Sequence, residues 1–128
     1  MDTSFARLWL RLEGLAALAL AALLYRHFGL SWLWFAVLLL APDLSLLGYL
    51  GGARVGAWCY NLAHTYAIAG LVLAAGLLAP LASAPRPALV GIGLIWCAHI
   101  GLDRALGYGL KSPAGFRFTH LGKIGREN

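Results

Sequence analysis

Two histidines and two aspartates interrupt stretches of this sequence that are otherwise strongly apolar. They are Asp43, His64, His99 and Asp103. Two imidazoles and two carboxylates are a suitable ligand set for a divalent metal ion such as Zn²⁺, Mn²⁺ or Fe²⁺. The carboxylates would offset the charge of the ion, and the ion would lower the pKa of a bound water toward about 7 and so generate hydroxide. These residue types therefore predict a metal-dependent hydrolytic site.

Further polar residues lie within or beside the same stretches and are candidates for other roles. Glu13, or an aspartate that does not bind the metal, could accept the proton of the water. The candidate catalytic carboxylates are therefore Glu13, Asp43 and Asp103. Groups that could hold an anionic or polar part of a substrate are Arg11, Asn61, Arg104, Lys111, Arg117 and His120. In the competing interpretation all these residues form a structural network, in which Arg11 pairs with Glu13 and the histidines bond each other or a backbone carbonyl.

The spacing of these residues predicts how two of the ligands are presented. His99 and Asp103 are four residues apart, so they lie on one face of a helix. Pro42 directly precedes Asp43, and its ring removes the helical hydrogen bond to the Leu38 carbonyl. We expect a kink at this proline that turns Asp43 inward and leaves room for a water or an ion.

Four apolar segments of at least 20 residues must position these side chains. At about 1.5 Å per residue, each can cross a hydrocarbon core of about 30 Å. The expected helices are residues 8–27, 31–50, 55–79 and 88–110, and their short loops make neighbours antiparallel. Hydrophobic residues make up 61% of the chain and charged residues 12%, which a soluble domain of this size cannot accommodate. We predict one transmembrane domain over residues 1–128, an all-α four-helix bundle with a short basic tail at 111–128.

The basic residues predict how this bundle would lie in a membrane. An even number of spans places both termini on one side, together with eight of the ten Lys and Arg residues. Because positive charge marks the cytoplasmic side, we predict a multi-pass protein of the cytoplasmic (inner) membrane with both ends inside. Counted from the cytoplasmic helix ends at about 1.5 Å per residue, the buried polar residues lie about 9 to 15 Å deep. Four helices therefore contribute to a single polar layer.

The net charge of +5 does not indicate nucleic acid. The chain has no basic helix interleaved with aromatic residues, so its cations are interpreted as orientation signals and lipid headgroup contacts. The expected partners are the lipid bilayer and a lipid or anionic small-molecule substrate. A homodimer is left open, because the sequence does not disclose the oligomeric state.

Five short segments resemble a small bacterial membrane family described only as domain of unknown function 4260. They are residues 41–45, 60–66, 98–104, 107–111 and 119–125. The resemblance extends over most of the chain and implies a four-helix membrane protein, but it implies no activity.

A more distant likeness is to inner-membrane proteins assigned as metal-dependent hydrolases. These share a Pro-Asp segment, a later segment with histidine, and a His-x-x-x-Asp motif, whose counterparts here are Asp43, His64 and the pair His99 and Asp103. The resemblance implies a metal at these residues. The chain departs from the pattern where Asn61 replaces a second histidine.

Two other functions are compatible with the same residues. His64 and His99 lie at matched depth on different helices, as axial ligands of a haem would. Alternatively, the polar layer could serve a non-catalytic membrane scaffold or a small ion- or proton-coupled transporter. A colourless preparation from haem-replete cells would eliminate the haem hypothesis.

Overall fold

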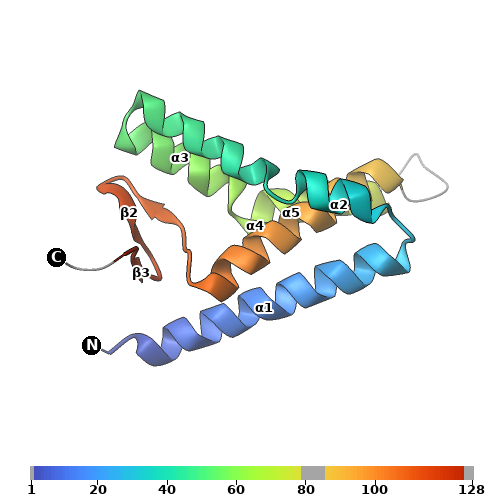
Figure 1. Ribbon diagram of the computed structural model, residues 1–128, viewed down its shortest axis with the longest axis horizontal. Coiled ribbons are helices and arrows are strands. Elements are labelled where there is room, and N and C mark those ends of the chain that lie inside the picture. The colour runs from blue at the N-terminus through green and yellow to red at the C-terminus, as the bar shows by residue number, and fades with distance from the viewer. Residues whose placement is uncertain (1, 79–85, 126–128) are drawn as a thin grey trace.

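The computed structural model describes residues 2–78 and 86–125, and Figure 1 shows a molecule built mainly of helices. The helices are α1 (Ser4–His27), α2 (Trp32–Leu38), the 3-10 helix η1 (Ala41–Gly51), α3 (Ala53–Ala63), α4 (Tyr66–Leu78) and α5 (Pro87–Leu106). Three short strands follow, β1 (Lys111–Ser112), β2 (Gly115–Thr119) and β3 (Gly122–Lys123). These helices form four apolar segments long enough to cross a membrane: Ser4–His27, Trp32–Gly51, Ala53–Leu78 and Pro87–Leu106. The prediction of four such segments is confirmed.

The first helix begins one turn earlier than the predicted residue 8. Asp2 accepts a hydrogen bond of 2.8 Å from the backbone N–H of Ser4. A carboxylate at this position satisfies one of the amides that a helix leaves unpaired at its start. This hydrogen bond stabilises the additional first turn of α1, which begins at Ser4.

The second span is not one helix over residues 31–50, because it breaks after Leu38 where the proline predicts a kink. Pro42 has no N–H, and the chain resumes as the 3-10 helix η1. The N–H of Asp43 bonds to the carbonyl of Leu40 at 3.0 Å. The carbonyl of Leu39 is therefore left for a partner elsewhere in the fold.

The third span also divides, at His64 and Thr65, between α3 and α4. Neither a proline nor a glycine lies at this break. Instead, the freed carbonyls accept tertiary hydrogen bonds, since Ala63 O is 2.5 Å from Trp96 Nε1 and His64 O is 2.9 Å from an Arg104 nitrogen. The predicted helix 55–79 is thus two helices, and its last residue lies outside the described part of the chain.

The fourth span ends at Leu106 and not at the predicted residue 110. Gly107 adopts a left-handed φ of 90°. Its N–H bonds to Arg104 O at 3.0 Å, and the N–H of Tyr108 bonds to Asp103 O at 2.8 Å. This pairing is a helix C-terminus of the Schellman type, which a glycine adopts without steric cost.

The tail predicted as a simple basic extension contains a three-stranded antiparallel sheet in the order β1-β2-β3. Apolar and polar residues alternate in Phe116, Arg117, Phe118 and Thr119, and this pattern is typical of a strand. Residues 126–128 of the predicted tail lie outside the described residues. In Figure 1 the sheet lies at the end of the molecule where α1 begins.

Helix α5 is the central element of the bundle. In the most apolar stretch of α5, 56% of the residues are buried, whereas no residue is buried in the corresponding stretch of Trp32–Gly51. The first half of α5 packs against α1 and α2 through a buried cluster of Tyr25, Val90, Leu94 and Ile95. The second half of α5 carries His99 and Asp103, so the helix that organises the fold also presents half of the predicted ligands.

Candidate metal centre

The four predicted metal ligands converge on one point. Asp43 comes from η1, and His64 comes from the break between α3 and α4. His99 and Asp103 come from α5. One potential ligand atom from each residue lies within 4.8 Å of the others. The fold therefore brings together two imidazoles and two carboxylates from three segments distant in sequence.

The separations between these atoms match those of ligands around a single ion. His64 Nε2 lies 3.0 Å from His99 Nε2, 3.1 Å from Asp43 Oδ1 and 3.3 Å from Asp103 Oδ2. His99 Nε2 lies 3.2 Å from Asp43 Oδ1 and 3.4 Å from Asp103 Oδ2. Ligands placed tetrahedrally at about 2.0 to 2.1 Å from an ion are about 3.3 Å apart. The cluster thus has the dimensions of a four-ligand site.

Both imidazoles present a lone pair to this point. His64 Nδ1 lies 2.8 Å from the carbonyl oxygen of Tyr60, and His99 Nδ1 lies 2.6 Å from that of Leu39. A carbonyl oxygen only accepts hydrogen bonds, so each Nδ1 carries the proton of the neutral ring and each Nε2 is an acceptor. If both rings are neutral, two acceptor nitrogens lie 3.0 Å apart beside two carboxylates, and positive charge at this point would stabilise them. A metal ion satisfies all four, and extra protons on the Nε2 atoms are the competing solution.

The helix breaks supply the carbonyls that orient the site. Leu39 O is available to His99 because η1 begins with a different hydrogen-bond pattern, and His64 itself lies where α3 ends. Arg104 donates to His64 O at 2.9 Å and to Tyr108 O at 3.0 Å, and it is only 7% exposed. Irregular backbone inside an apolar segment is tolerated where other groups satisfy it.

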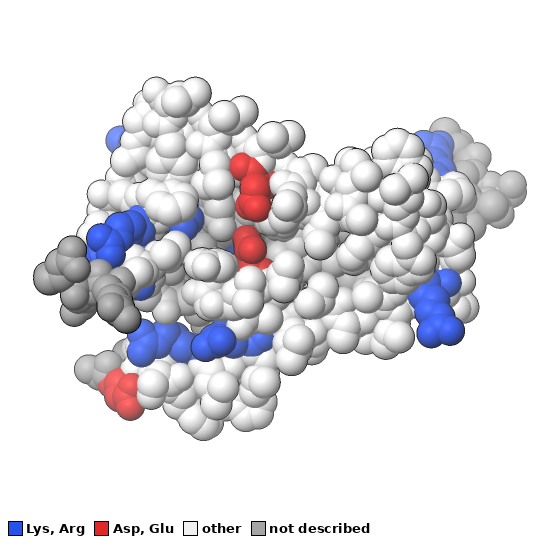
Figure 2. Space-filling model, in the orientation of Figure 1, with Lys and Arg blue, Asp and Glu red and all other residues white. Residues whose placement is uncertain are grey.

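The cluster has a closed side and an open side. The side chains of His64 and His99 are 0% and 1% exposed, whereas those of Asp103 and Asp43 are 15% and 39% exposed. The imidazoles therefore form the interior wall and the carboxylates form the mouth. In Figure 2 acidic side chains reach the surface near the middle of the molecule, away from its ends.

Tyr60 is a neighbour of the cluster that was not predicted from the sequence. Its ring stacks on the His64 ring with centroids 3.7 Å apart and planes 7° apart, and its hydroxyl donates to Asp103 Oδ2 at 3.4 Å. Tyr60 precedes His64 by four residues, and residues with this spacing share a helix face. That spacing was the signal available in the sequence.

Lys111 lies beside the cluster and is only 5% exposed. Its Nζ lies 3.9 Å from the centroid of the Phe116 ring and 4.9 Å from that of Tyr60. Burial lowers the pKa of Lys111, although the charges of Asp103 and Asp43 act in the opposite direction. The ammonium group of Lys111 is thus buried against two aromatic rings within the electrostatic influence of both carboxylates, and its predicted role toward a substrate stays a prediction.

The other predicted site residues lie outside the cluster. Glu13 is exposed on α1, and Arg11 uses its Nε to bond to Ala105 O at 2.9 Å. Arg117 Nε bonds to Ile124 O at 2.8 Å within the tail. His120 Nδ1 accepts a bond of 2.8 Å from the N–H of Leu110. The structure gives Arg11, Arg117 and His120 contacts with the backbone, and their role toward a substrate stays a prediction.

Asn61 attaches the tail to α3. Its Oδ1 accepts the N–H of Lys111 at 2.6 Å, and its Nδ2 donates to Lys111 O at 2.9 Å. We expect Asn61→Leu to weaken attachment of the tail by about 1 to 3 kcal/mol, because both backbone groups lose their partner. Trypsin should then cleave after Arg117 about tenfold faster or more. Leu62→Ala, at a half-exposed neighbouring position, is the control, and equal cleavage of both variants would contradict the expectation.

His120 makes the attachment of the tail sensitive to pH. Burial lowers the pKa of His120, and the charge of Arg104 lowers it further. Its contribution is therefore present above the ordinary pKa of about 6.5 and is lost as pH falls through the lower pKa of the folded state. After correction for the intrinsic rate at each pH, hydrogen exchange in β2 should be faster at about pH 5 than at about pH 7.5. His120→Gln keeps an acceptor without titrating and should remove this acceleration; its persistence would assign the effect to another group.

Four apolar helical spans around a buried His/Asp cluster, followed by a small sheet, define the class of this protein. Residues 7–124 match the family model described as Domain of unknown function (DUF4260), and the chain belongs to that family. No curated protein and no solved structure matches the chain. The family match is confirmed, whereas its bacterial origin and the likeness to metal-dependent hydrolases stay predictions.

Proposed function

We propose that this protein is a membrane-embedded metal-dependent hydrolase that acts on an ester or phosphoester near the cytoplasmic face. One observation carries the proposal: two imidazoles and two carboxylates meet within 4.8 Å, with the carboxylates on an open side. The haem alternative loses support, because Nε2 atoms 3.0 Å apart with carboxylates at the same point leave no space for a porphyrin.

Three features support the membrane location. The molecule has four apolar spans, and many large apolar side chains on them are exposed, such as Leu20 at 60% and Leu71 at 70%. Figure 2 shows basic groups gathered at the end that carries the sheet and a smaller number at the opposite end. Positive charge favours the cytoplasm, so the end that carries the sheet faces that side. The described cations of the sheet end are Arg7, Arg11, Arg54, Arg104, Lys111, Arg117 and Lys123.

The residues around the cluster have distinct roles in the proposed reaction. Asp43, His64, His99 and Asp103 would hold a divalent ion, which would supply Lewis-acid activation of a water molecule. Asp43 has the more exposed carboxylate, so its second oxygen is placed to accept the proton of that water at the open side. The hydroxyl of Tyr60 orients Asp103. The ammonium group of Lys111 binds the developing negative charge of the substrate.

Hydrolysis by protein reconstituted in lipid nanodiscs tests the proposal. The protein is stripped with a chelator, reloaded with Zn²⁺, Mn²⁺ or Fe²⁺, and assayed on chromogenic carboxylic esters, phosphomonoesters and phosphodiesters. We expect hydrolysis only after reloading, and a decrease of about 10² to 10⁴ in kcat for Asp43→Asn, since the variant loses a ligand and a base. Asp2→Asn, at an exposed position, is the control. Hydrolysis that survives chelation or Asp43→Asn would refute the proposal, and bound metal without hydrolysis would favour the scaffold or transporter.

A further inference from the structure

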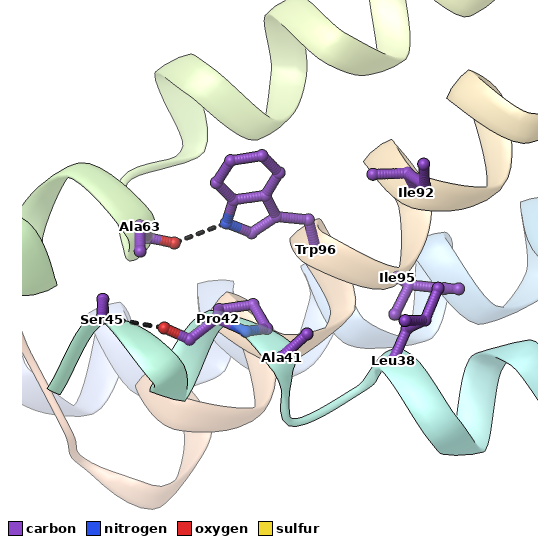
Figure 3. Close-up of a pocket in the computed structure, with 8 residues that line it drawn as sticks. All are labelled: Leu38, Ala41, Pro42, Ser45, Ala63, Ile92, Ile95 and Trp96. Carbon is purple, nitrogen blue, oxygen red and sulfur yellow. Dashed lines mark hydrogen bonds between the residues drawn. The ribbon is translucent and has the colours of Figure 1, made fainter. Parts of the chain in front are cut away.

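Figure 3 shows the residues that line an apolar groove of the protein. It has a volume of about 410 Å³ and lies between η1, the end of α3 and α5. Three of its lining residues precede cluster residues along the chain by one to three positions: Pro42, Ala63 and Trp96. The groove therefore lies next to the backbone segments that carry Asp43, His64 and His99.

A second groove of about 330 Å³ continues the first one. The two share Leu38, Ile92 and Ile95, and the second extends along α5 as far as Pro87. From Trp96 to Pro87, α5 rises by about 14 Å at 1.5 Å per residue. Together the grooves form a channel along the membrane-spanning part of α5, which we call the lateral groove.

The lining of the lateral groove suits hydrocarbon and not water. Near the cluster, Trp96 Nε1 is already bonded to Ala63 O at 2.5 Å, and Ser45 Oγ to Pro42 O at 2.7 Å. Figure 3 shows both bonds along the wall of the groove, with the aliphatic side chains of Leu38, Ile92 and Ile95 toward its other end. Apolar walls whose polar groups are satisfied favour an apolar occupant.

We propose that the lateral groove binds the acyl chain of a membrane lipid and so presents the ester or phosphoester of that lipid to the cluster. The inference rests on the proposed function, because it names the substrate class of the same site. A straight chain fits a groove that runs along one helix and opens toward the bilayer at Ala41 and Ile92, both of which are exposed.

Photocrosslinking tests the inference. The probe is phosphatidylglycerol with a diazirine in the middle of one acyl chain, added to the full chain in nanodiscs, and the labelled residues are mapped by mass spectrometry. We expect labels to concentrate on Leu38, Ile92 and Ile95. In Gly91→Leu this labelling should fall about tenfold, because the new side chain displaces about two methylene groups of the bound chain.

The structure offers matched variants for this experiment. A Cβ at Gly91 would lie 3.5 Å from Leu30 and 3.8 Å from Tyr25, which are ordinary contacts, so the new side chain extends into the groove without a backbone clash. Gly70 is the control, because a Cβ there meets no heavy atom of the described residues within 4 Å. Gly70→Leu should leave labelling of the groove unchanged. If Gly91→Leu does not fold, Gly91→Ala should give a smaller decrease in the same direction.

The two proposals fail in different ways. Labels spread evenly over the exposed leucines of α1, or labelling indifferent to the Gly91 variants, would overturn the acyl-chain site even if the protein binds metal stoichiometrically. Labelling confined to the groove in protein that binds no metal would support the acyl-chain site and overturn the hydrolase. Metal content of each labelled sample therefore separates the outcomes.

Discussion

Purified protein exposed to divalent metal holds one ion per chain, and His99→Ala holds none; this is the largest effect that we expect. His99 contributes one of the two lone-pair nitrogens, and its Nδ1 is held by Leu39 O at 2.6 Å. Loss of an outer hydrogen-bonding partner alone lowers metal affinity by about 10- to 100-fold. Loss of a ligand should therefore lower affinity by more than about 100-fold.

Elemental analysis after equilibration with Zn²⁺, Mn²⁺ or Fe²⁺ and removal of free metal measures this prediction. His27→Ala is a matched control, because His27 is exposed at the end of α1 opposite the sheet. A second measurement is the thermal midpoint, since metal at about 100 times its Kd stabilises the folded parent by about 2.7 kcal/mol. That gain should disappear in His99→Ala.

The competing arrangement places protons, and not a metal, on the two Nε2 atoms. It gives a clearly different result, because the parent chain would then bind no metal and its stability would be unaffected by chelator. Such a result would convert the cluster into a structural ion-pair network and remove the basis of the proposed hydrolase. It would leave the four-span fold unchanged.

Gly14→Ala should strongly destabilise the bundle. A Cβ at Gly14 would lie 2.3 Å from Arg104 Cβ, 2.8 Å from Gly101 O and 2.9 Å from Ala105 N. Two of these neighbours are backbone atoms of α5, so α1 and α5 must separate to admit a methyl group. Overpacking of this kind costs about 1 to 3 kcal/mol. Small residues that let helix backbones approach are typical of membrane helix interfaces.

The same substitution should also affect the metal centre. Arg104 lies at this crossing and bonds to the carbonyl of His64, so a shift of α5 would move a partner of the ligand. We expect a lower denaturation midpoint in detergent together with weaker metal binding. Gly70→Ala, on α4, is the control and should be neutral or slightly stabilising, because the added methyl group meets open space and reduces the freedom of the unfolded chain. Equal stability of the two variants would show that the helices can separate at no cost.

Local chemistry made several features of the fold predictable from the sequence. The four apolar segments follow from composition and length, because each holds enough consecutive apolar residues to cross a bilayer. The break before Asp43 follows from Pro42, which has no N–H to donate. The end of α5 at Gly107 was also available from the sequence, since glycine favours the left-handed conformation of a helix terminus.

Other features depend on contacts between distant segments. The break at His64 carries no proline or glycine, and it is stabilised by Trp96 and Arg104 from α5. Asn61 has a suitable depth for a site residue, yet its amide is committed to the backbone of Lys111. Neither outcome can be read from one segment, because the hydrogen-bond partner lies at least 33 residues away in the sequence.

The sequence by itself determined the four apolar spans and the residue types of the cluster, because composition and length suffice to recognise a segment that can cross a bilayer. Only the tertiary structure decided that the imidazoles of His64 and His99 face each other, with Glu13 outside the cluster. Depth follows from counting along a helix, whereas the rotation of each helix about its axis depends on how closely its neighbours approach. In this protein that rotation is set by the glycine contact between α1 and α5 and by the two helix breaks.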